Sequence, residues 1–337
     1  MPEAAPRARP GSRRLALPAE TGVVAVLLAA CAWLAILFPE FRTGANASVI
    51  LSSGAEIAIV SAGMTLVIAT GGIDISVGSV VGLCAVALGV LGVDHGWNVW
   101  MACGAAVAVG AGCGLVNGLL IARLGLPPII ATLASFSAAR AGAYVLSGGN
   151  SISGLPPALI SLGYDSRLGV PNSAWVAGAA LLLCSLAAHR TVFGRSLLAL
   201  GGNREAAYLS GSPTRRVETA VYTLSGLLAG LSAIVVTSRG ATAVPDAGRY
   251  FEMSAITAVV IGGTPVVGGR ATVLGTALGV LAIGVVTNGV RSYGKDDMWV
   301  LLVLGAMLLV SVEVDRWRTK RTARAARGAP PTPPAGR

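Results

Sequence analysis

The chain has 337 residues and a formal net charge of +10, and it is 54% hydrophobic but only 12% charged. A soluble domain carries about 25% charged residues, so this composition excludes a protein whose whole surface faces water. The apolar runs recur from end to end and predict a polytopic membrane protein. Its spans are expected to be helices, because backbone polar groups in lipid must pair internally and the runs are too long for barrel strands.

The apolar runs predict an all-α transmembrane bundle of about ten spans. A helix needs about 20 residues to cross the membrane at about 1.5 Å per residue. The expected spans are residues 21–38, 48–70, 77–93, 97–122, 128–147, 174–188, 218–238, 253–268, 271–290 and 298–312. The first run follows four arginines and also fits a secretory signal peptide. We expect an uncleaved span, because no small-x-small cleavage site precedes Phe38-Pro39-Glu40.

The arginines predict the orientation of these spans. One set of alternate connections holds most of the cations, and the other set holds only Arg42, Arg167, Arg239, Arg249, Arg291 and Lys295. Since basic connections stay in the cytoplasm, both termini are expected there. The chain then divides into a disordered N-terminal tail (1–20), a transmembrane domain (21–315) with a long cytoplasmic loop (189–217), and a basic, Pro-rich cytoplasmic tail (316–337).

No cofactor, metal or catalytic site is expected in this chain. The five cysteines lie in apolar segments without ligand spacing, and the two histidines fall in loops. The sequence contains no GxxxxGK[ST] phosphate loop, no HExxH and no GxSxG. The basic charge lies between apolar runs, which assigns it to orientation rather than to nucleic-acid binding. We therefore expect that this chain is not an enzyme.

Three connections stand out for their glycines. Residues 148–173 form the longest external connection, with a short surface helix expected at 157–162. The stretches 71–78 (GGIDISVG) and 262–269 (GGTPVVGG) share a glycine frame, which leaves an internal repeat open.

The connection between the second and third spans carries an unusual charge. Gly71 and Gly72 end one apolar run, Asp74 follows, and Ser76 begins the next. A charge at the membrane centre costs about 2.5–3.5 kcal/mol, so Asp74 is expected in protein or in a water-filled path. One role is a cap of the third span, by Asp74 or Ser76, at the cytoplasmic membrane surface. The other is direct contact with a solute; the predicted topology favours the cap.

Other polar side chains lie within or beside the apolar runs. A single Asn, Ser or Thr in a span is more often a contact between helices than a ligand contact. As a group, they also offer hydrogen bonds along a path for a neutral solute. The candidates for a translocation pathway or gate are Gly71, Gly72, Asp74, Ser76, Asn117, Thr132, Ser135 and Asn288.

Two charges inside the spans are expected to pair. Glu56 lies about 12 Å deep from the outer face, and Arg140 lies about 18 Å up from the inner face. With a hydrocarbon core of about 30 Å, both reach the same depth, which predicts a buried Glu56–Arg140 ion pair. The alternative is that each side chain faces water near the outer mouth.

The cytoplasmic loop 189–217 is expected to contain a helix that contacts a partner. Asn203 fits an N-cap, and Glu205 falls in the first turn, where the helix dipole favours an anion. Gly211 would end the helix. An ordinary amphipathic loop helix is the alternative, but the position in the largest basic loop favours a partner contact. The residues assigned to this contact are Arg195, Gly202, Asn203, Glu205, Ala206, Ala207 and Gly211.

Five blocks stand in a characteristic order: GMTLVIATGGIDISVGS (63–79), GLVNGLLIARLGLPPIIATLASFSAARA (114–141), GRSLLALGGNREAAYLSG (194–211), YTLSGLLAGLSAIVVTSR (222–239) and FEMSAITAVVIGGTPVVGGRATVLGTALG (251–279). Together they resemble the ribose/xylose-type permease family of bacterial ABC transporters, and Glu205-Ala206-Ala207 with Gly211 matches the EAA-x3-G pattern of ABC permeases. Met253-Ser254 stands where the family usually has Leu-Asp, and GGRA (268–271) stands where it often has GGRG, which leaves the sugar open.

This resemblance implies an importer subunit in the bacterial inner membrane, surrounded by membrane lipid. It implies a second permease copy, identical or related, a cytoplasmic ATPase that uses ATP and magnesium, and an extracytoplasmic sugar-binding protein. Transport would proceed by alternating access, with the ATPase moving the coupling helix at 203–211. The alternatives are a same-fold permease for a nucleoside, polyol or signalling sugar, and an ion-coupled secondary transporter with its site at Asp74, Glu56 or Arg140. A membrane-embedded enzyme is disfavoured by the missing motifs.

Overall fold

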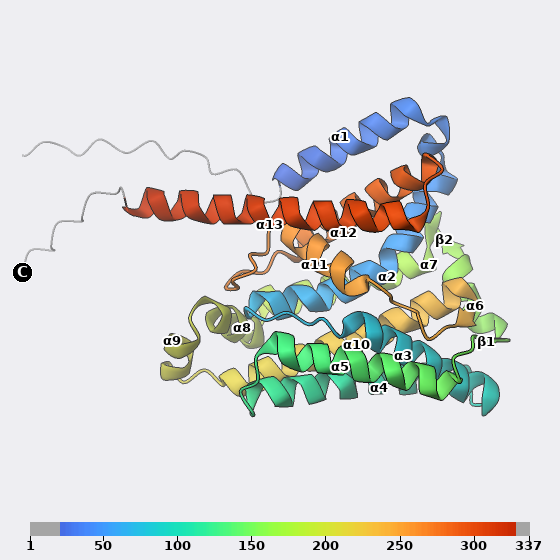
Figure 1. The fold of residues 1–337 in the computed structure, drawn as a ribbon, viewed down its shortest axis with the longest axis horizontal. Helices are drawn as coiled ribbons and strands as arrows, with labels where there is room; N and C mark the ends of the chain where they lie inside the picture. Colours follow the sequence, from blue (N-terminus) through green and yellow to red (C-terminus); the bar gives the residue numbers. More distant parts are fainter. Residues whose placement is uncertain (1–20, 328–337) are drawn as a thin grey trace, which may run out of the picture.

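The computed structural model describes residues 21–327, and they form a bundle of helices (Figure 1). The helices are α1 (Thr21–Leu37), α2 (Gly44–Ala69), α3 (Val77–Gly89), α4 (Val99–Ala122), α5 (Pro128–Ser147), α6 (Pro157–Tyr164), α7 (Asn172–Arg190), α8 (Val192–Gly202), α9 (Arg204–Leu209), α10 (Thr214–Gly240), α11 (Phe251–Ile261), α12 (Val273–Ser292) and α13 (Asp297–Arg327). A 3-10 turn, η1 (Pro39–Arg42), precedes α2, and a π-helical turn, η2 (Val90–Asp94), extends α3.

Four short strands complete the described part of the chain. β1 (Ile152–Ser153) pairs antiparallel with β4 (Thr242–Ala243), and β2 (Ser166–Arg167) pairs with β3 (Val170–Pro171). The helix expected at 157–162 is confirmed as α6. The long connection 148–173 is therefore held to the bundle by a β pair and by α6.

Every expected span contains a helix, so the prediction of a polytopic helical bundle is confirmed. Seven helices of the described chain are long and apolar enough to cross a membrane: α2, α3 with η2, α4, α5, α7, α10 and α12. The apolar helices α1, α11 and residues 298–314 of α13 are shorter. The run expected at 253–268 ends early as a helix, because the backbone turns away at Gly263, whose φ is +90°.

The two ends of the bundle differ. The start of α1 and the end of α13 lie at the same end as α8 and α9, whereas β1, β2 and α6 lie at the other end (Figure 1). Residues 316–327, expected in the C-terminal tail, continue α13 as helix. The disorder expected at 1–20, and the last ten residues of the tail, lie outside the described residues.

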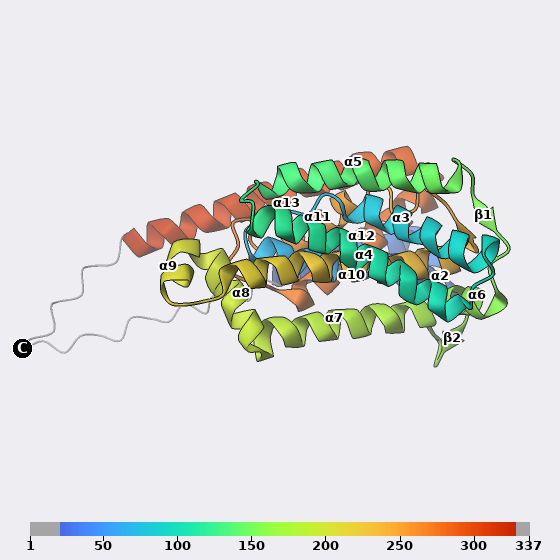
Figure 2. The same cartoon turned by 90° about the horizontal axis from the view of Figure 1, so that it is seen from below.

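Glycines bring α4 against α10 at the centre of the fold (Figure 2). A Cβ built on Gly114 would lie 2.2 Å from the carbonyl oxygen of Tyr222, and one on Gly110 would lie 2.3 Å from that of Gly226. In the other direction, a Cβ on Gly226 would lie 2.1 Å from the carbonyl oxygen of Gly110. Because these positions carry no side chain, the two backbones are in contact. In a membrane, where the hydrophobic effect does not drive helices together, such close van der Waals packing stabilises their association.

The two connections that share the glycine frame, 71–78 and 262–269, contact each other beside α8. Gly269 donates its backbone N–H to the carbonyl oxygen of Ala69 at 2.9 Å. A Cβ on Gly201 of α8 would lie 1.9 Å from that same oxygen. The connection between α2 and α3 and the one between α11 and α12 therefore form a single contact with α8. An internal repeat stays a prediction.

Replacement of Gly114 by Ala should separate α4 from α10 and destabilise the protein by about 1–3 kcal/mol, the usual cost of overpacking. The matched control is Gly112→Ala on the same helix, where a Cβ meets no atom within 4 Å. That change should be neutral or should stabilise by up to about 1 kcal/mol through helix propensity. Thermal unfolding of the two purified variants in detergent compares them, and equal midpoints would contradict the close-packing account.

Candidate functional site

Asp74 lies buried where the connection between α2 and α3 meets α10. Its side chain is 1% exposed. Oδ1 accepts hydrogen bonds from the backbone N–H of Ser76 at 3.1 Å and from Ser76 Oγ at 2.6 Å, and Oδ2 accepts one from Ser225 Oγ of α10 at 2.9 Å. Both oxygens are thus paired, as a buried carboxyl group requires. The carboxyl group ties a non-helical connection to the central helix.

The hydrogen bonds continue from Ser76 to α4 and α5. Asn117 Nδ2 donates to Ser76 Oγ at 2.9 Å, and Ser135 Oγ of α5 donates to Asn117 Oδ1. Thr132 Oγ1 shares its proton between the carbonyl oxygens of Pro128 at 2.9 Å and Ile73 at 3.3 Å. The connection between α2 and α3 is therefore held by side chains from three helices, α4, α5 and α10. We call this the Asp74 network.

One face of α10 contacts this network and also α9. Glu218, Tyr222 and Ser225 are spaced by four and three residues, so they lie on the same side of the helix. Tyr222 is fully buried, and a Cβ on Gly72 would lie 2.3 Å from its hydroxyl oxygen. That oxygen has no hydrogen-bond partner within the described chain. Gly72 fits here because the Tyr222 hydroxyl group occupies the space of a side chain.

The pathway candidates therefore fall into two places. Gly71, Gly72, Asp74 and Ser76 share the connection, and Asn117, Thr132 and Ser135 hydrogen-bond to it or to each other. Asn288 lies elsewhere: its amide exchanges hydrogen bonds of 2.8 and 3.2 Å with that of Asn46. Ser225 and Tyr222 were not singled out from the sequence. Their helical spacing from Glu218 is the signal that could have found them.

The interpretation of Ser76 as the cap of α3 is wrong. Ser76 precedes α3 but makes no side-chain cap hydrogen bond. Asp74 accepts the backbone N–H two residues on, as a cap does, but it is buried in protein and also binds α10. The connection is buried because α3, α4, α5 and α10 enclose it, which a count of residues along the chain does not reveal.

The predicted Glu56–Arg140 ion pair is also wrong. Glu56 Oε1 accepts a hydrogen bond from Arg239 Nη2 at 2.6 Å. Arg140 Nη1 donates to the carbonyl oxygen of Pro245 at 2.6 Å and lies 3.8 Å from Asp246 Oδ1. Depth alone suggested the pair, but α2 packs against α10, whereas α5 packs against α3 and α4. Because α10 continues to Gly240, Arg239 stands on the helix that neighbours Glu56.

At the end of the bundle with α8 and α9, the expected local structure of the loop is confirmed. α9 begins after Asn203, whose Oδ1 accepts the N–H of Ala206 at 3.0 Å. Gly211, with a φ of +82°, follows the end of the helix. Ala207 faces inward, while Ala206 and Tyr208 are exposed. The sequence did not predict α8, which carries the exposed Arg195 and ends at Gly202.

An ion pair joins α9 to α10. Arg204 Nη2 donates to Glu218 Oε2, and the Glu218 side chain is 5% exposed while that of Arg204 is 59% exposed. The residue next to Glu205 thus connects to the face of α10 that carries Tyr222 and Ser225.

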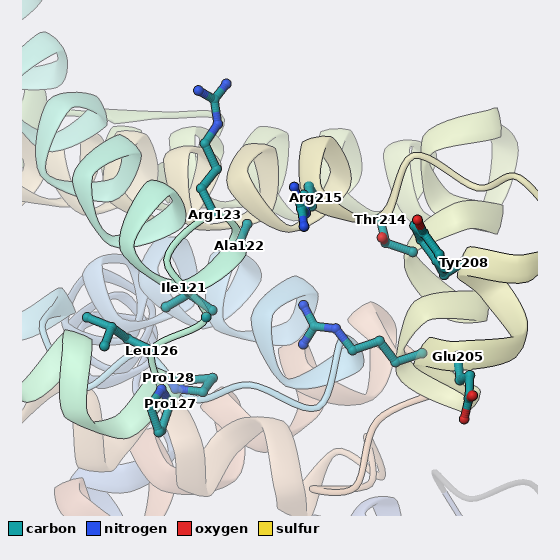
Figure 3. Close-up of a pocket in the computed structure, with 12 residues that line it drawn as sticks. Ile121, Ala122, Arg123, Leu126, Pro127, Pro128, Glu205, Tyr208, Thr214 and Arg215 are labelled. Carbon is teal, nitrogen blue, oxygen red and sulfur yellow. The ribbon is translucent and has the colours of Figure 1, made fainter.

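A cavity of about 680 Å³ lies beside α9. Figure 3 shows the connection between α4 and α5 on one side of it and α9 on the other. Arg123, Arg204 and Arg215 line it together with Glu205 and Tyr208. The exposed surface at this end is basic and hollow, which suits a protein partner that inserts an acidic or polar segment.

Comparison with known proteins gives concordant matches. The family model described as "Branched-chain amino acid transport system / permease component" matches residues 46–312. The chain is 34% identical to the fructose import permease protein of Rhizobium meliloti, over 91% of this chain and 87% of that protein. It is 37% identical to the ribose import permease protein of Escherichia coli (strain K12), over 86% and 91%. It is 38% identical to the ribose import permease protein of Bacillus subtilis (strain 168), over 84% and 88%. No solved structure matches the chain.

Substitutions of Asp74 should separate hydrogen bonding from charge. Asp74→Asn keeps an acceptor for Ser76 and offers an amide to the Ser225 hydroxyl, so folded protein should fall little. Asp74→Leu leaves buried donors of Ser76 and Ser225 without partners, at about 1–3 kcal/mol for each unpaired group. The yield and thermal midpoint of purified protein measure this. Equal loss of stability in both variants would contradict the network.

A charge swap should restore the pair with Arg239 but not one with Arg140. Glu56→Ala and Arg239→Ala should each lower the free energy of unfolding, and with it the thermal midpoint. The loss should be smaller than the value of about 3–5 kcal/mol for a fully buried pair, since Arg239 is partly exposed. Glu56→Arg combined with Arg239→Glu should recover part of this loss. The matched control, Glu56→Arg with Arg140→Glu, should recover none. Rescue in the control alone would refute the observed pairing.

Proposed function

Since the chain belongs to the family of transport-system permease components, we propose that it is the membrane-spanning subunit of an ABC importer for a monosaccharide. The family match over residues 46–312 carries the proposal. Relatives named for ribose and fructose import align with more than four fifths of this chain, which supports a sugar of that size. Uptake assays with individual sugars identify the one that it carries.

The energy would come from a partner ATPase that binds ATP and magnesium and docks on α9. Three features support this contact: the exposed Glu205 and Tyr208, the adjacent basic cavity, and the capped start of α9 at Asn203. The arginine-rich connections lie at the same end of the bundle and would face the cytoplasm with both termini. An extracytoplasmic sugar-binding protein would then meet the end that carries α6 and β1 to β4.

Alternating access would be driven through α10. Movement of α9 pulls on Glu218 through Arg204, and the same face of α10 holds Asp74 through Ser225. A shift of α10 therefore acts on the connection between α2 and α3, and through Asn117 on Ser135 of α5. A second permease copy, identical or related, would supply the other wall of the pathway.

An ion-coupled secondary transporter is the alternative that the buried carboxyl groups of Asp74 and Glu56 favour. The two functions differ in their energy source. Uptake that stops with a catalytically dead ATPase supports the importer. Uptake that persists and follows a proton or sodium gradient supports the secondary transporter.

Charge reversal at Glu205 should uncouple transport from ATP hydrolysis. Glu205 is exposed in the first turn of α9, so Glu205→Lys should leave the protein folded but reduce ATP-driven sugar uptake by about tenfold or more, as loss of a charged contact at an interface does. The matched control is Glu40→Lys, the same reversal at an exposed residue of η1, just before α2. Uptake in vesicles with the partner ATPase measures both. Normal uptake in Glu205→Lys would contradict the assignment.

A further inference from the structure

A second cavity lies toward the end of the bundle that is remote from α9. It has a volume of about 400 Å³, within the range of about 300–1,000 Å³ typical of small-molecule sites. Residues of α2, α10, α11, α12 and α13 and the residues just before α11 line it. Its charged residues are Glu56, Arg239, Arg249 and Arg291, and Ser53, Tyr250 and Thr287 also line it.

The cavity holds a buried acceptor and a buried donor that are both unpaired. Glu56 is 5% exposed, and its Oε1 binds Arg239, but its Oε2 has no hydrogen-bond partner within the described chain. The Nε of Arg239 is likewise buried and unpaired there. Buried polar atoms are nearly always satisfied, so each such atom calls for a partner that the polypeptide does not supply.

The chemistry of the two orphan atoms selects a neutral hydroxyl compound. A hydroxyl group can donate to Glu56 Oε2 and accept from Arg239 Nε, since it carries one proton and two lone pairs. Arg249 and Arg291 also line the cavity and would attract an anion, so the proton donor that Glu56 Oε2 requires is what favours a hydroxyl compound over a fully ionised ligand. The hydroxyl-bearing side chains of Ser53 and Thr287 and the ring of Tyr250 line the same cavity. Such a mixture of polar groups and an aromatic ring suits a small polyhydroxylated molecule.

We propose that this cavity is a monosaccharide subsite of the protein, in which Glu56 and Arg239 bind neighbouring hydroxyl groups of the sugar. The inference rests on the proposed function for the class of ligand. Its place follows from the fold: the end of α10, the start of α11 and the end of α12 gather opposite α9. In the proposed orientation a sugar released outside reaches this cavity before it reaches the Asp74 network.

Cysteine protection tests the subsite without any ATPase. Ser53→Cys on α2 and Thr287→Cys on α12 place thiols in the lining at half-buried positions, with little change in size. The matched control is Ser292→Cys, which is exposed on α12 and outside the cavity. The full-length protein in lipid nanodiscs is labelled with a small methanethiosulfonate reagent, with and without millimolar ribose, fructose, xylose or inorganic phosphate. The unsubstituted protein measures the background of the five native cysteines.

At least one sugar should slow labelling at both positions 53 and 287 and leave position 292 unchanged, while phosphate should have no effect. Adding Glu56→Gln should weaken this protection about tenfold, the loss of one hydrogen bond to a charged group. The proposal is overturned if no sugar protects either position, if phosphate protects equally, or if position 292 slows in parallel. Failure here with intact ATP-driven uptake overturns the subsite alone. Protection by sugar without ATP-driven uptake keeps the subsite and overturns the importer.

Discussion

The buried carboxyl group of Asp74 is the constraint on which the centre of the bundle depends. The connection between α2 and α3 leaves helical geometry inside a protein interior, where each free backbone group would be costly. Asp74 accepts one such N–H from Ser76 and binds α10 through Ser225. Because α10 also packs against α2, α3 and α4, this contact sets where the connection and the start of α3 lie relative to the central helix.

The hydrogen bonds that hold this connection also require the backbones of neighbouring helices to lie close together. Gly72 leaves room for the Tyr222 hydroxyl group, and Gly110 and Gly114 let α4 touch α10, which brings Asn117 within reach of Ser76. Side chains at these glycines would move the hydrogen-bonding partners apart. The polar network and the glycine contacts therefore support each other. The ion pair between Arg204 and Glu218 extends the same face of α10 to α9, so the proposed coupling route needs no separate linkage.

Local chemistry was predictable from the sequence, and spatial neighbours were less so. The apolar runs identified the helices, and Asn203 and Gly211 marked α9, because caps depend on residues next to each other. The list of pathway candidates gathered most of the Asp74 network, since a polar residue in an apolar run needs a partner. The pairing of Glu56 was missed because depth along two helices does not say which helices touch. The contact of Asp74 with α10 was missed because the connection sits among helices from distant parts of the chain.

A double-mutant cycle between Asp74 and Ser225 tests the central claim most directly. The free energy of unfolding is measured for the unsubstituted protein, Asp74→Leu, Ser225→Ala and the double variant, in one detergent. Residues that share a buried hydrogen bond couple by about 0.5–3 kcal/mol, so the double variant should lose less stability than the sum of the two single variants. Strictly additive losses would show that the two side chains act independently, and would contradict the account of α10 as the helix that holds the connection.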